Sequence, residues 1–312
     1  MTVFLTGGTG FVGSYVLRAL LRAGHDVRCL MRDPSDPLVL PDPSSEPTGP
    51  SVERVRGDIT DPSSLGDHLS GCDAVVHLVG IIEEHPGRGI TFQRIHVEGT
   101  RHIADKARQA GVDRFIHMSA NGARPSDGTA YQTTKWEAEQ IVQAAGFEHW
   151  TIFRPSILFG DPGPDSPEFA SQLLAELIRP FPVWPIFGDG MYQIQPVAVE
   201  EIASAFVQAI EHPAASGRTY FAGGPDRIAY RHVLDIIARG AGLKPKPKVS
   251  VPMPLARLGV STVGRTGLLP ISPAQFNMLI EGNTGDNSAF YDDFDLTPTR
   301  FTEEALAYLR NR

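Results

Sequence analysis

The stretch VFLTGGTGFVG, residues 3–13, decides the fold that the rest of the chain must support. An apolar run comes first, and glycines follow at Gly7, Gly10 and Gly13, where a helical pattern begins. Glycine permits a tight turn and a close helix–strand contact, and the N–H groups at a helix N-terminus attract phosphate. No Gly-Lys-Ser/Thr follows that would indicate a mononucleotide P-loop. The stretch therefore predicts a turn that binds a dinucleotide pyrophosphate through Gly7, Thr9, Gly10, Phe11, Val12 and Gly13.

The first half of the chain alternates short apolar runs with amphipathic helical patterns. Runs rich in Val, Ile and Phe without polar alternation are typical of parallel strands that are buried on both faces. Right-handed crossovers then give an α/β fold with a doubly wound parallel sheet, the Rossmann arrangement. The expected strands are 3–6, 26–31, 52–56, 74–78, 114–119 and 150–154, and the expected helices are 11–23, 62–69, 93–110 and 130–145.

The second half of the chain has a different character. Residues 32–51 are rich in Pro, Ser and Asp and predict an exposed loop, and a Pro/Gly-rich segment follows Arg154. Ser166 and Pro167 are expected to begin a helix, 199–212 is a further helix, and a strand from Arg218 returns to the sheet. We expect a dinucleotide-binding domain of residues 1–155 and 196–223, and a smaller, mainly C-terminal cap domain of residues 156–195 and 224–312.

Composition excludes several classes of protein. The 312-residue chain has a formal charge of −8 and no long basic run, so a nucleic-acid partner is not expected. No apolar segment is long enough to span a membrane, and the first residues enter a strand directly, which favours a cytoplasmic protein. Two cysteines indicate no disulfide framework, and the ten histidines form no ligand cluster, so no metal is expected.

Tyr131 and Lys135 stand in Tyr-x-x-x-Lys spacing on an expected helix, so their side chains share one face. A lysine ammonium beside a phenol favours the phenolate, and we expect it to lower the pKa of Tyr131 towards the working pH. The pair is therefore a candidate for general acid–base catalysis.

The end of the second strand indicates which dinucleotide is bound. NAD sites carry a carboxylate there, whereas this chain has Arg32, whose guanidinium suits a 2′-phosphate, with Arg28 as a second candidate. Arg32 makes NADP the expected cofactor, and the adjacent Asp33 leaves NAD as the alternative. Other expected cofactor contacts are Asp58 and Ile59, and the end of the fourth strand at Leu78, Val79 and Gly80.

The motifs TGGTGFVG, GDITDP, HVEGT, YQTTK and RPSILFG together resemble the extended or atypical short-chain dehydrogenase/reductases, the epimerase/dehydratase-like group. The longer segments YQTTKWEAEQIV and FRPSILFGDPG are most similar to the branch of the nucleotide-binding accessory subunit of respiratory complex I and its bacterial relatives. The resemblance implies hydride transfer at nicotinamide, Tyr131 as acid–base group, and Lys135 on the nicotinamide ribose. It also implies that Pro155, Ser156 and Ile157 pass beside the nicotinamide.

The chain departs from this pattern at several positions. The usual polarising serine falls near Asn121, so Ser119 and Asn121 are both candidates for that donor. His96 replaces an asparagine that supports a water relay, and a buried, hydrogen-bonded histidine is its simpler interpretation. Gln193 and Gln195 stand where relatives that act on nucleotide sugars place an arginine, which disfavours epimerase or dehydratase activity.

Three functions follow in order of preference. The first is an NAD(P)-dependent oxidoreductase acting on a small carbonyl or alcohol, hydrophobic if the segments PVWPIF and LLPISPAQF line the cap. The second is a non-catalytic NADP(H)-binding assembly or sensor protein, and the third a nucleotide-sugar epimerase or dehydratase. The partner is a small-molecule substrate, and the resemblance leaves open a homodimer or a protein-complex partner.

Overall fold

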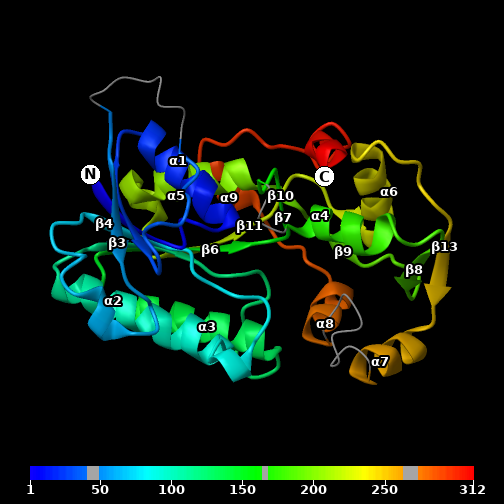
Figure 1. Ribbon diagram of the computed structural model, residues 1–312, viewed down its shortest axis with the longest axis horizontal. Helices are drawn as coiled ribbons and strands as arrows, with labels where there is room; N and C mark the ends of the chain where they lie inside the picture. The colour runs from blue at the N-terminus through cyan, green and yellow to red at the C-terminus, as the bar shows by residue number, and fades with distance from the viewer. Residues whose placement is uncertain (41–48, 164–167, 263–272) are drawn as a thin grey trace. The chain divides into compact units, whose positions relative to one another are not determined.

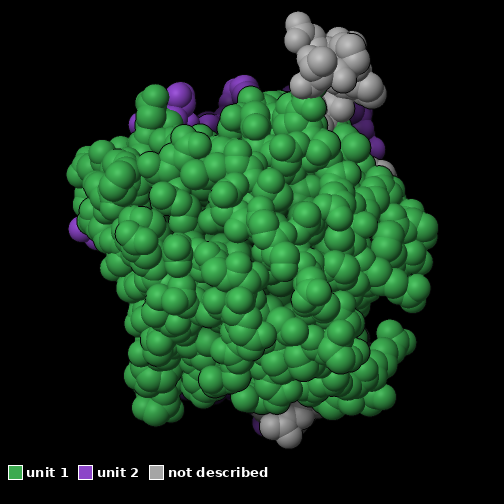
Figure 2. All heavy atoms as spheres, turned by 90° about the vertical axis from the view of Figure 1, so that its left-hand side faces the viewer, with its two compact units in different colours: residues 1–155, 200–222, 288–296 green, residues 156–199, 223–287, 297–312 purple. Residues whose placement is uncertain are grey.

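The computed structural model describes residues 1–40, 49–163, 168–262 and 273–312. The chain divides into two compact units, coloured separately in Figure 2. The first comprises Met1–Pro155, Glu200–Ala222 and Ser288–Leu296, and the second Ser156–Val199, Gly223–Asn287 and Thr297–Arg312. Residues 288–296 therefore belong with the first unit, whereas the sequence had assigned them to the cap.

The first unit is built on a seven-stranded parallel sheet with the order β11-β6-β5-β4-β1-β2-β3. This is the doubly wound order, in which the chain reverses direction between β1 and β4. All six strands expected in the first half are present, and the strand expected from Arg218 is the edge strand β11. The strands are β1 (Thr2–Thr6), β2 (Asp26–Met31), β3 (Val52–Arg56), β4 (Ala74–His77), β5 (Arg114–Met118), β6 (His149–Pro155) and β11 (Arg218–Ala222).

Helices cover both faces of this sheet. In Figure 1, α2 and α3 lie on one face, and α1, α5 and α9 lie on the other. The face under α2 and α3 holds a core that includes Phe115, Ile103 and Val142. The helices are α1 (Phe11–Arg22), α2 (Gly99–Gln109), α3 (Ala130–Ala144), α5 (Val199–Glu211) and α9 (Ser288–Asp293). This is the Rossmann-like α/β fold expected from the sequence.

Two expected helices take a different form. The segment expected at 62–69 is only a 3-10 turn, η1 (Pro62–Leu65), because Gly66 adopts a positive φ of 47° and ends it. The segment expected at 93–110 begins as a π-helix, η3 (Gln93–Glu98), and becomes the α-helix α2 at Gly99. Short 3-10 turns also occur at η2 (Pro86–Arg88) and η5 (Pro213–Ala215).

The second unit consists of short elements around its own apolar core, with Trp184, Leu234 and Ile237 near its centre. Two of its small sheets are parallel pairs (β7 with β10, β8 with β13), and the third pairs β9 with β12 antiparallel. The elements are β7 (Leu158–Phe159), α4 (Phe169–Leu173), η4 (Leu174–Ile178), β8 (Trp184–Phe187), β9 (Gln193–Ile194), β10 (Val197–Ala198), β12 (Ile228–Ala229), α6 (Tyr230–Gly240), β13 (Lys248–Val251), α7 (Met253–Thr262), α8 (Pro273–Glu281) and η7 (Ala307–Asn311).

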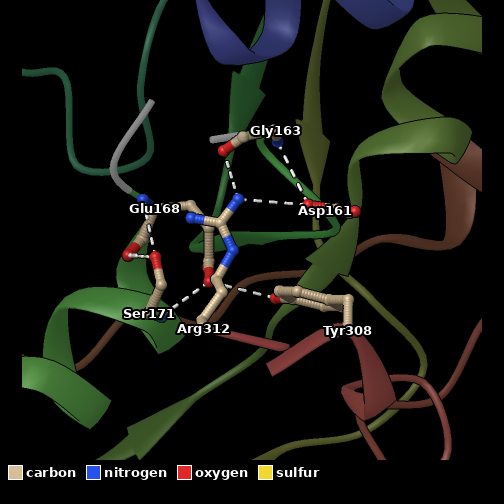
Figure 3. Close-up of polar contacts among 6 residues, drawn as sticks. All are labelled: Asp161, Gly163, Glu168, Ser171, Tyr308 and Arg312. Atoms are coloured by element: carbon tan, nitrogen blue, oxygen red, sulfur yellow. Dashed lines mark hydrogen bonds and ion pairs between the residues drawn. The ribbon is translucent and has the colours of Figure 1, made fainter. Parts of the chain in front are cut away.

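The C-terminal residues of this unit are tied to the start of α4 (Figure 3). Buried Glu168 caps the helix by accepting hydrogen bonds from the N–H groups of Ala170 and Ser171. The Tyr308 hydroxyl also donates to the Glu168 carboxylate, at 3.0 Å. The Arg312 guanidinium pairs with Asp161 at 3.2 Å and donates to the carbonyl oxygen of Gly163. Glu168 thus caps the helix, whereas Ser166 and Pro167, expected to begin it, lie outside the described residues.

No helix in the described ranges is long and apolar enough to cross a membrane. The loop expected at 32–51 has no helix in residues 32–40 or 49–51, and its remaining residues lie outside the description. Both cysteines, Cys29 and Cys72, are buried and free.

The glycine-rich turn allows a test of this packing. A Cβ at Gly13 would lie 1.9 Å from the carbonyl oxygen of Gly7, whereas a Cβ at Gly87 would meet no atom within 4 Å. Because backbone must move to relieve the first clash, Gly13→Ala should lower the free energy of unfolding by about 2–3 kcal/mol. Gly87→Ala is the matched control and should change it by less than about 0.5 kcal/mol. Denaturant titration measures both, and equal stability of the two variants would contradict the close contact.

Candidate active site

The glycine-rich turn leaves the start of α1 open. Gly10 is the N-cap residue and provides no side chain to cap the helix, and the first turn contains no acidic residue. The positive end of the helix dipole is therefore uncompensated by protein groups, as an anion site requires. Thr9 and Gly10 are exposed, Phe11 and Val12 are half-buried, and Gly13 is buried against the turn.

The turn and the end of β4 are in direct contact. Gly7 has a φ of +81°, and a Cβ there would lie 3.3 Å from atoms of Leu78 and Val79. Two residues further along, a Cβ at Gly80 would lie 3.0 Å from Lys135 Nζ and 3.7 Å from His96 Nε2. The residues after β4 therefore run from the glycine-rich turn to Lys135, and a side chain at position 80 would press on that ammonium. The structure brings these expected site residues together within one unit.

Helix α3 begins immediately before the tyrosine. Thr129 and Gln132 form a reciprocal capping box, so the first turn, which contains Tyr131, is fixed. Tyr131 is half-buried and Lys135 is only 4% exposed. The Lys135 ammonium donates a hydrogen bond to the carbonyl oxygen of Met118, the last residue of β5, at 3.0 Å. The lysine is thus anchored at the carboxyl end of the sheet.

The expected effect of Lys135 on Tyr131 is wrong for this structure. Burial raises the pKa of Tyr131 to about 12, and no charge offsets this. Burial also lowers the pKa of Lys135 to about 8, against a smaller opposing effect of Glu139. Because the ammonium is directed to the Met118 carbonyl, desolvation dominates both groups. Tyr131 is therefore a neutral phenol at neutral pH.

A second buried charge lies one helical turn beyond Lys135. Glu139 is fully buried and accepts two hydrogen bonds from the Arg154 guanidinium of β6, at 2.8 and 2.5 Å. This bidentate pair joins α3 to the sheet next to the lysine. The carboxylate favours the charged form of Lys135, although burial outweighs it.

Three histidines surround Lys135 in the layer between the sheet and α2/α3. The rings of His77 and His117 stack with centroids 5.5 Å apart, and His77 is held by the hydroxyls of Thr6 and Thr100 at 2.7 and 3.1 Å. Burial, with a further contribution from the Lys135 charge, lowers the pKa of His77 and of His96 to about 3. These rings are neutral at physiological pH and add no competing positive charge.

Ser119 and Asn121, the two candidates for a substrate donor, are placed differently. Ser119 is 1% exposed, and its hydroxyl has no hydrogen-bond partner among the described residues, a property that it shares with both ring nitrogens of His117. Asn121 is half-buried, and its backbone N–H donates to the carbonyl oxygen of Pro155 at 3.0 Å. Asn121 is therefore the more accessible of the two.

At the end of β2, Arg32 is exposed and makes no hydrogen bond or ion pair within the described part of the chain. The adjacent Asp33 accepts hydrogen bonds from the N–H and hydroxyl of Ser35, which lower the pKa of Asp33. Arg28, the second candidate for phosphate, is instead engaged with Glu53 at 2.6 Å and with the carbonyls of His68 and Ser70. The sequence-based suggestion for Arg28 is thus wrong.

Arg56 was not recognised from the sequence. It pairs in register with Met31 and is exposed, so it emerges beside the end of β2, where its charge acts on Asp33. The sequence contained the alternation of Arg54 and Arg56 on the third strand. Only the pairing of β3 with β2, however, brings the second arginine to this edge.

The remaining expected cofactor residues have structural roles. The Asp58 carboxylate accepts hydrogen bonds from the N–H and hydroxyl of Thr60, and the Ile59 side chain packs in the core under α2. Pro155 ends β6 in the first unit. Ser156 and Ile157 belong to the second unit, where the Ser156 hydroxyl donates to the carbonyl of Asn283 at 3.0 Å.

In the second unit, Gln195 is buried and donates through its amide to the carbonyl oxygen of Gly224 at 2.9 Å, while Gln193 is exposed on β9. The expected lining of the cap needs correction: Trp184 and Ile186 are buried in the core, and Phe276 packs in a separate cluster. The start of the segment LLPISPAQF lies outside the described residues. Within the described ranges, no group of three His, Cys, Asp or Glu residues could hold a metal ion.

Comparisons with known proteins agree with this geometry. A model of the NAD dependent epimerase/dehydratase family matches residues 3–223. Sterol demethylase protein B of Methylococcus capsulatus is 27% identical over 346 aligned positions, covering 100% of this chain and 99% of that protein. The mitochondrial NADH dehydrogenase (ubiquinone) 1 alpha subcomplex subunit 9 of Rattus norvegicus is 30% identical, covering 87% of this chain and 68% of that protein. The solved structure of MoeE5 with UDP-glucuronic acid and NAD matches with a TM-score of 0.72 at 21% identity, covering 100% and 98% of the two chains. The last comparison shows the fold alone.

The burial of Lys135 predicts a pH-dependent stability. The folded lysine releases its proton near pH 8, whereas the unfolded one keeps it to about pH 10.5. Between these values the unfolded state binds more protons, so the free energy of unfolding should rise with pH relative to Lys135→Met. The difference between the two proteins should change by up to about 3 kcal/mol across that window. Denaturant titrations at several pH values measure it, and a constant difference would mean that Lys135 titrates normally.

Proposed function

The chain belongs to the NAD dependent epimerase/dehydratase family, and on this basis we propose that it is an NADP(H)-dependent oxidoreductase that reduces a small carbonyl compound. The observation that carries the proposal is the continuity of the site in the first unit. Gly7 contacts Leu78 and Val79, and Gly80 contacts Lys135, which shares a helix face with Tyr131. A phosphate-binding turn and a proton donor therefore lie at opposite ends of one short segment.

The residues fit a dinucleotide. The uncapped start of α1 suits the pyrophosphate, and the glycines leave space that a Cβ would fill at Gly7 and Gly13. A bound dinucleotide would supply a hydride at its nicotinamide. Leu78, Val79 and Gly80 would line its path, and the Lys135 ammonium would hold a ribose hydroxyl beside the Met118 carbonyl.

The protonation states favour reduction over oxidation. Tyr131 is protonated at neutral pH, because burial raises its pKa to about 12, and in the reductive direction the phenol would donate its proton to a carbonyl oxygen as the adjacent carbon is reduced. Asn121 is the candidate donor that polarises the carbonyl. The name of the Methylococcus relative supports an apolar, sterol-like substrate.

The cofactor preference rests on charge at the end of β2. Arg32 is free to form a bidentate pair with a 2′-phosphate, Arg56 adds a second charge, and Asp33 is occupied by Ser35. NAD is the alternative.

A second candidate function is a cofactor-binding subunit of a protein complex, without turnover. The similarity to the rat NADH dehydrogenase subunit favours it. So does the direction of the Lys135 ammonium, which bonds to the Met118 carbonyl.

The arginine at position 32 gives the first test. Loss of a charge-assisted pair with the 2′-phosphate should weaken NADPH binding by about ten- to a hundredfold in Arg32→Ala. NADH lacks that phosphate, so its affinity should be unchanged. Calorimetric titration of both dinucleotides measures this, with Arg22→Ala, an exposed arginine at the end of α1, as the control. Equal losses for NADPH and NADH would contradict the phosphate assignment.

The tyrosine gives the second test. Tyr131→Phe should bind NADPH as the wild type does but lower the rate of carbonyl reduction by about 10²- to 10⁴-fold, because the proton donor is missing. NADPH consumption with a panel of apolar ketones and aldehydes measures the rate. Equal rates in both proteins would remove Tyr131 from catalysis. Tight NADPH binding without turnover in either protein would favour the complex subunit.

A further inference from the structure

His96 occupies a position where three parts of the first unit meet. It lies in the π-helix η3, is 1% exposed, and faces helix α3 and the residues that follow β4. Its Nδ1 is 3.0 Å from the Thr134 hydroxyl, and its Nε2 is 3.1 Å from the backbone nitrogen of Ile81. The ring therefore joins α3 to the segment that carries Gly80.

The hydrogen bonds assign the tautomer of this ring. The Thr134 hydroxyl lies 2.8 Å from the carbonyl oxygen of Ala130 and 3.0 Å from His96 Nδ1, and Nε2 lies 3.1 Å from both the nitrogen and the carbonyl oxygen of Ile81. With the proton on Nδ1, His96 donates to Thr134, Thr134 donates to Ala130, and the Ile81 N–H donates to Nε2. This assignment satisfies one more donor than the opposite tautomer. The ring is neutral, in keeping with the nearby charge of Lys135.

The same ring also fixes the candidate proton donor. His96 stacks on Phe92 with centroids 5.3 Å apart, and the ring of Tyr131 contacts both, at 5.5 Å from His96 and 5.7 Å from Phe92. Both contacts of Tyr131 are edge-to-face, a favourable arrangement for aromatic pairs. The three rings form a closed triangle, which an asparagine at position 96 could not complete.

We propose that His96 is a positioning residue that holds the Tyr131 ring and the Ile81 peptide at once, so that the proton donor and the cofactor-lining segment at Gly80 keep a fixed relation. The proposal rests on the proposed function. The two roles of His96 depend on different interactions: the ring contacts orient Tyr131, and the hydrogen bonds anchor Ile81. A substitution can therefore remove one role and leave the other. The proposed role of His96 requires both an aromatic ring and two polar ring atoms.

Two variants separate these roles. His96→Phe keeps the ring but loses both hydrogen bonds, so the Ile81 N–H should exchange with solvent about tenfold faster and NADPH should bind about tenfold more weakly. In this variant the NMR signal of the Tyr131 ring should remain at its wild-type position. His96→Asn keeps a donor and an acceptor but loses the ring. Its Ile81 exchange and NADPH affinity should stay within about threefold of wild type, while the Tyr131 ring signal moves towards that of free tyrosine.

The readouts are amide hydrogen exchange, calorimetry, and NMR of 13C-labelled tyrosine, with the Tyr131 signal assigned by its absence in Tyr131→Phe. His232→Asn, an exposed histidine in the second unit, is the control and should change none of them. The proposal is supported if His96→Phe changes the Ile81 exchange and the NADPH affinity but not the Tyr131 signal, while His96→Asn changes the Tyr131 signal alone. It is overturned if both variants change the same readouts, or if neither variant changes any. If the wild type binds no dinucleotide, the proposed function fails, but the exchange and ring signals still decide the role of His96.

Discussion

A single buried positive charge constrains much of the first unit. The Lys135 ammonium is nearly excluded from solvent, which costs enough free energy to lower its pKa to about 8. The Met118 carbonyl at the end of β5 accepts a hydrogen bond from the ammonium, and the Glu139–Arg154 pair places a carboxylate one turn away. A Cβ at position 80 would lie 3.0 Å from the ammonium, a tight contact. The surrounding imidazoles must stay neutral because a second buried cation would be expensive.

This constraint links the two ends of the site. Gly80 is two residues from Leu78, and Leu78 contacts Gly7 in the turn that opens α1. Residues 78–80 therefore form a continuous segment between the glycine-rich turn and Lys135. The doubly wound sheet makes this arrangement possible, because β4 pairs with β1 on one side and with β5 on the other. The helix start, residues 78–80 and the Tyr131–Lys135 pair consequently meet at the carboxyl edge of one sheet, where ligand sites lie in this class of fold.

The sequence predicted the sheet well because buried parallel strands need continuous apolar runs, and these are visible without knowledge of their neighbours. Residues 26–31 and 52–56 were predicted with the bounds that the structure has. The glycine-rich turn and the Tyr131–Lys135 pair were also visible, since spacing alone places them on a turn and on one helix face. The π-helical start at residues 93–98 could not be predicted, because its hydrogen bonds leave no mark in a periodic apolar pattern.

Properties that depend on through-space neighbours were harder to predict. The roles of Arg28 and Arg56 were misjudged or missed because they follow from strand pairing with β3, and the raised pKa of Tyr131 depends on where the Lys135 ammonium points. His96 appeared only as a departure from the family pattern, whereas the structure shows its contacts with Phe92, Tyr131 and Ile81. The residues 288–296 join the first unit because α9 packs near β11, a long-range contact with no local signal.

The most direct test of this account is the titration of Lys135 itself. The signal of its ε-carbon can be followed by NMR in protein labelled with 13C-lysine and assigned with Lys135→Met, in the presence and absence of NADPH. The account predicts a pKa of about 8 in the free protein and a marked change of the signal when NADPH binds. A pKa close to 10.5, with a signal that ignores NADPH, would show that the lysine is neither buried nor part of a dinucleotide site.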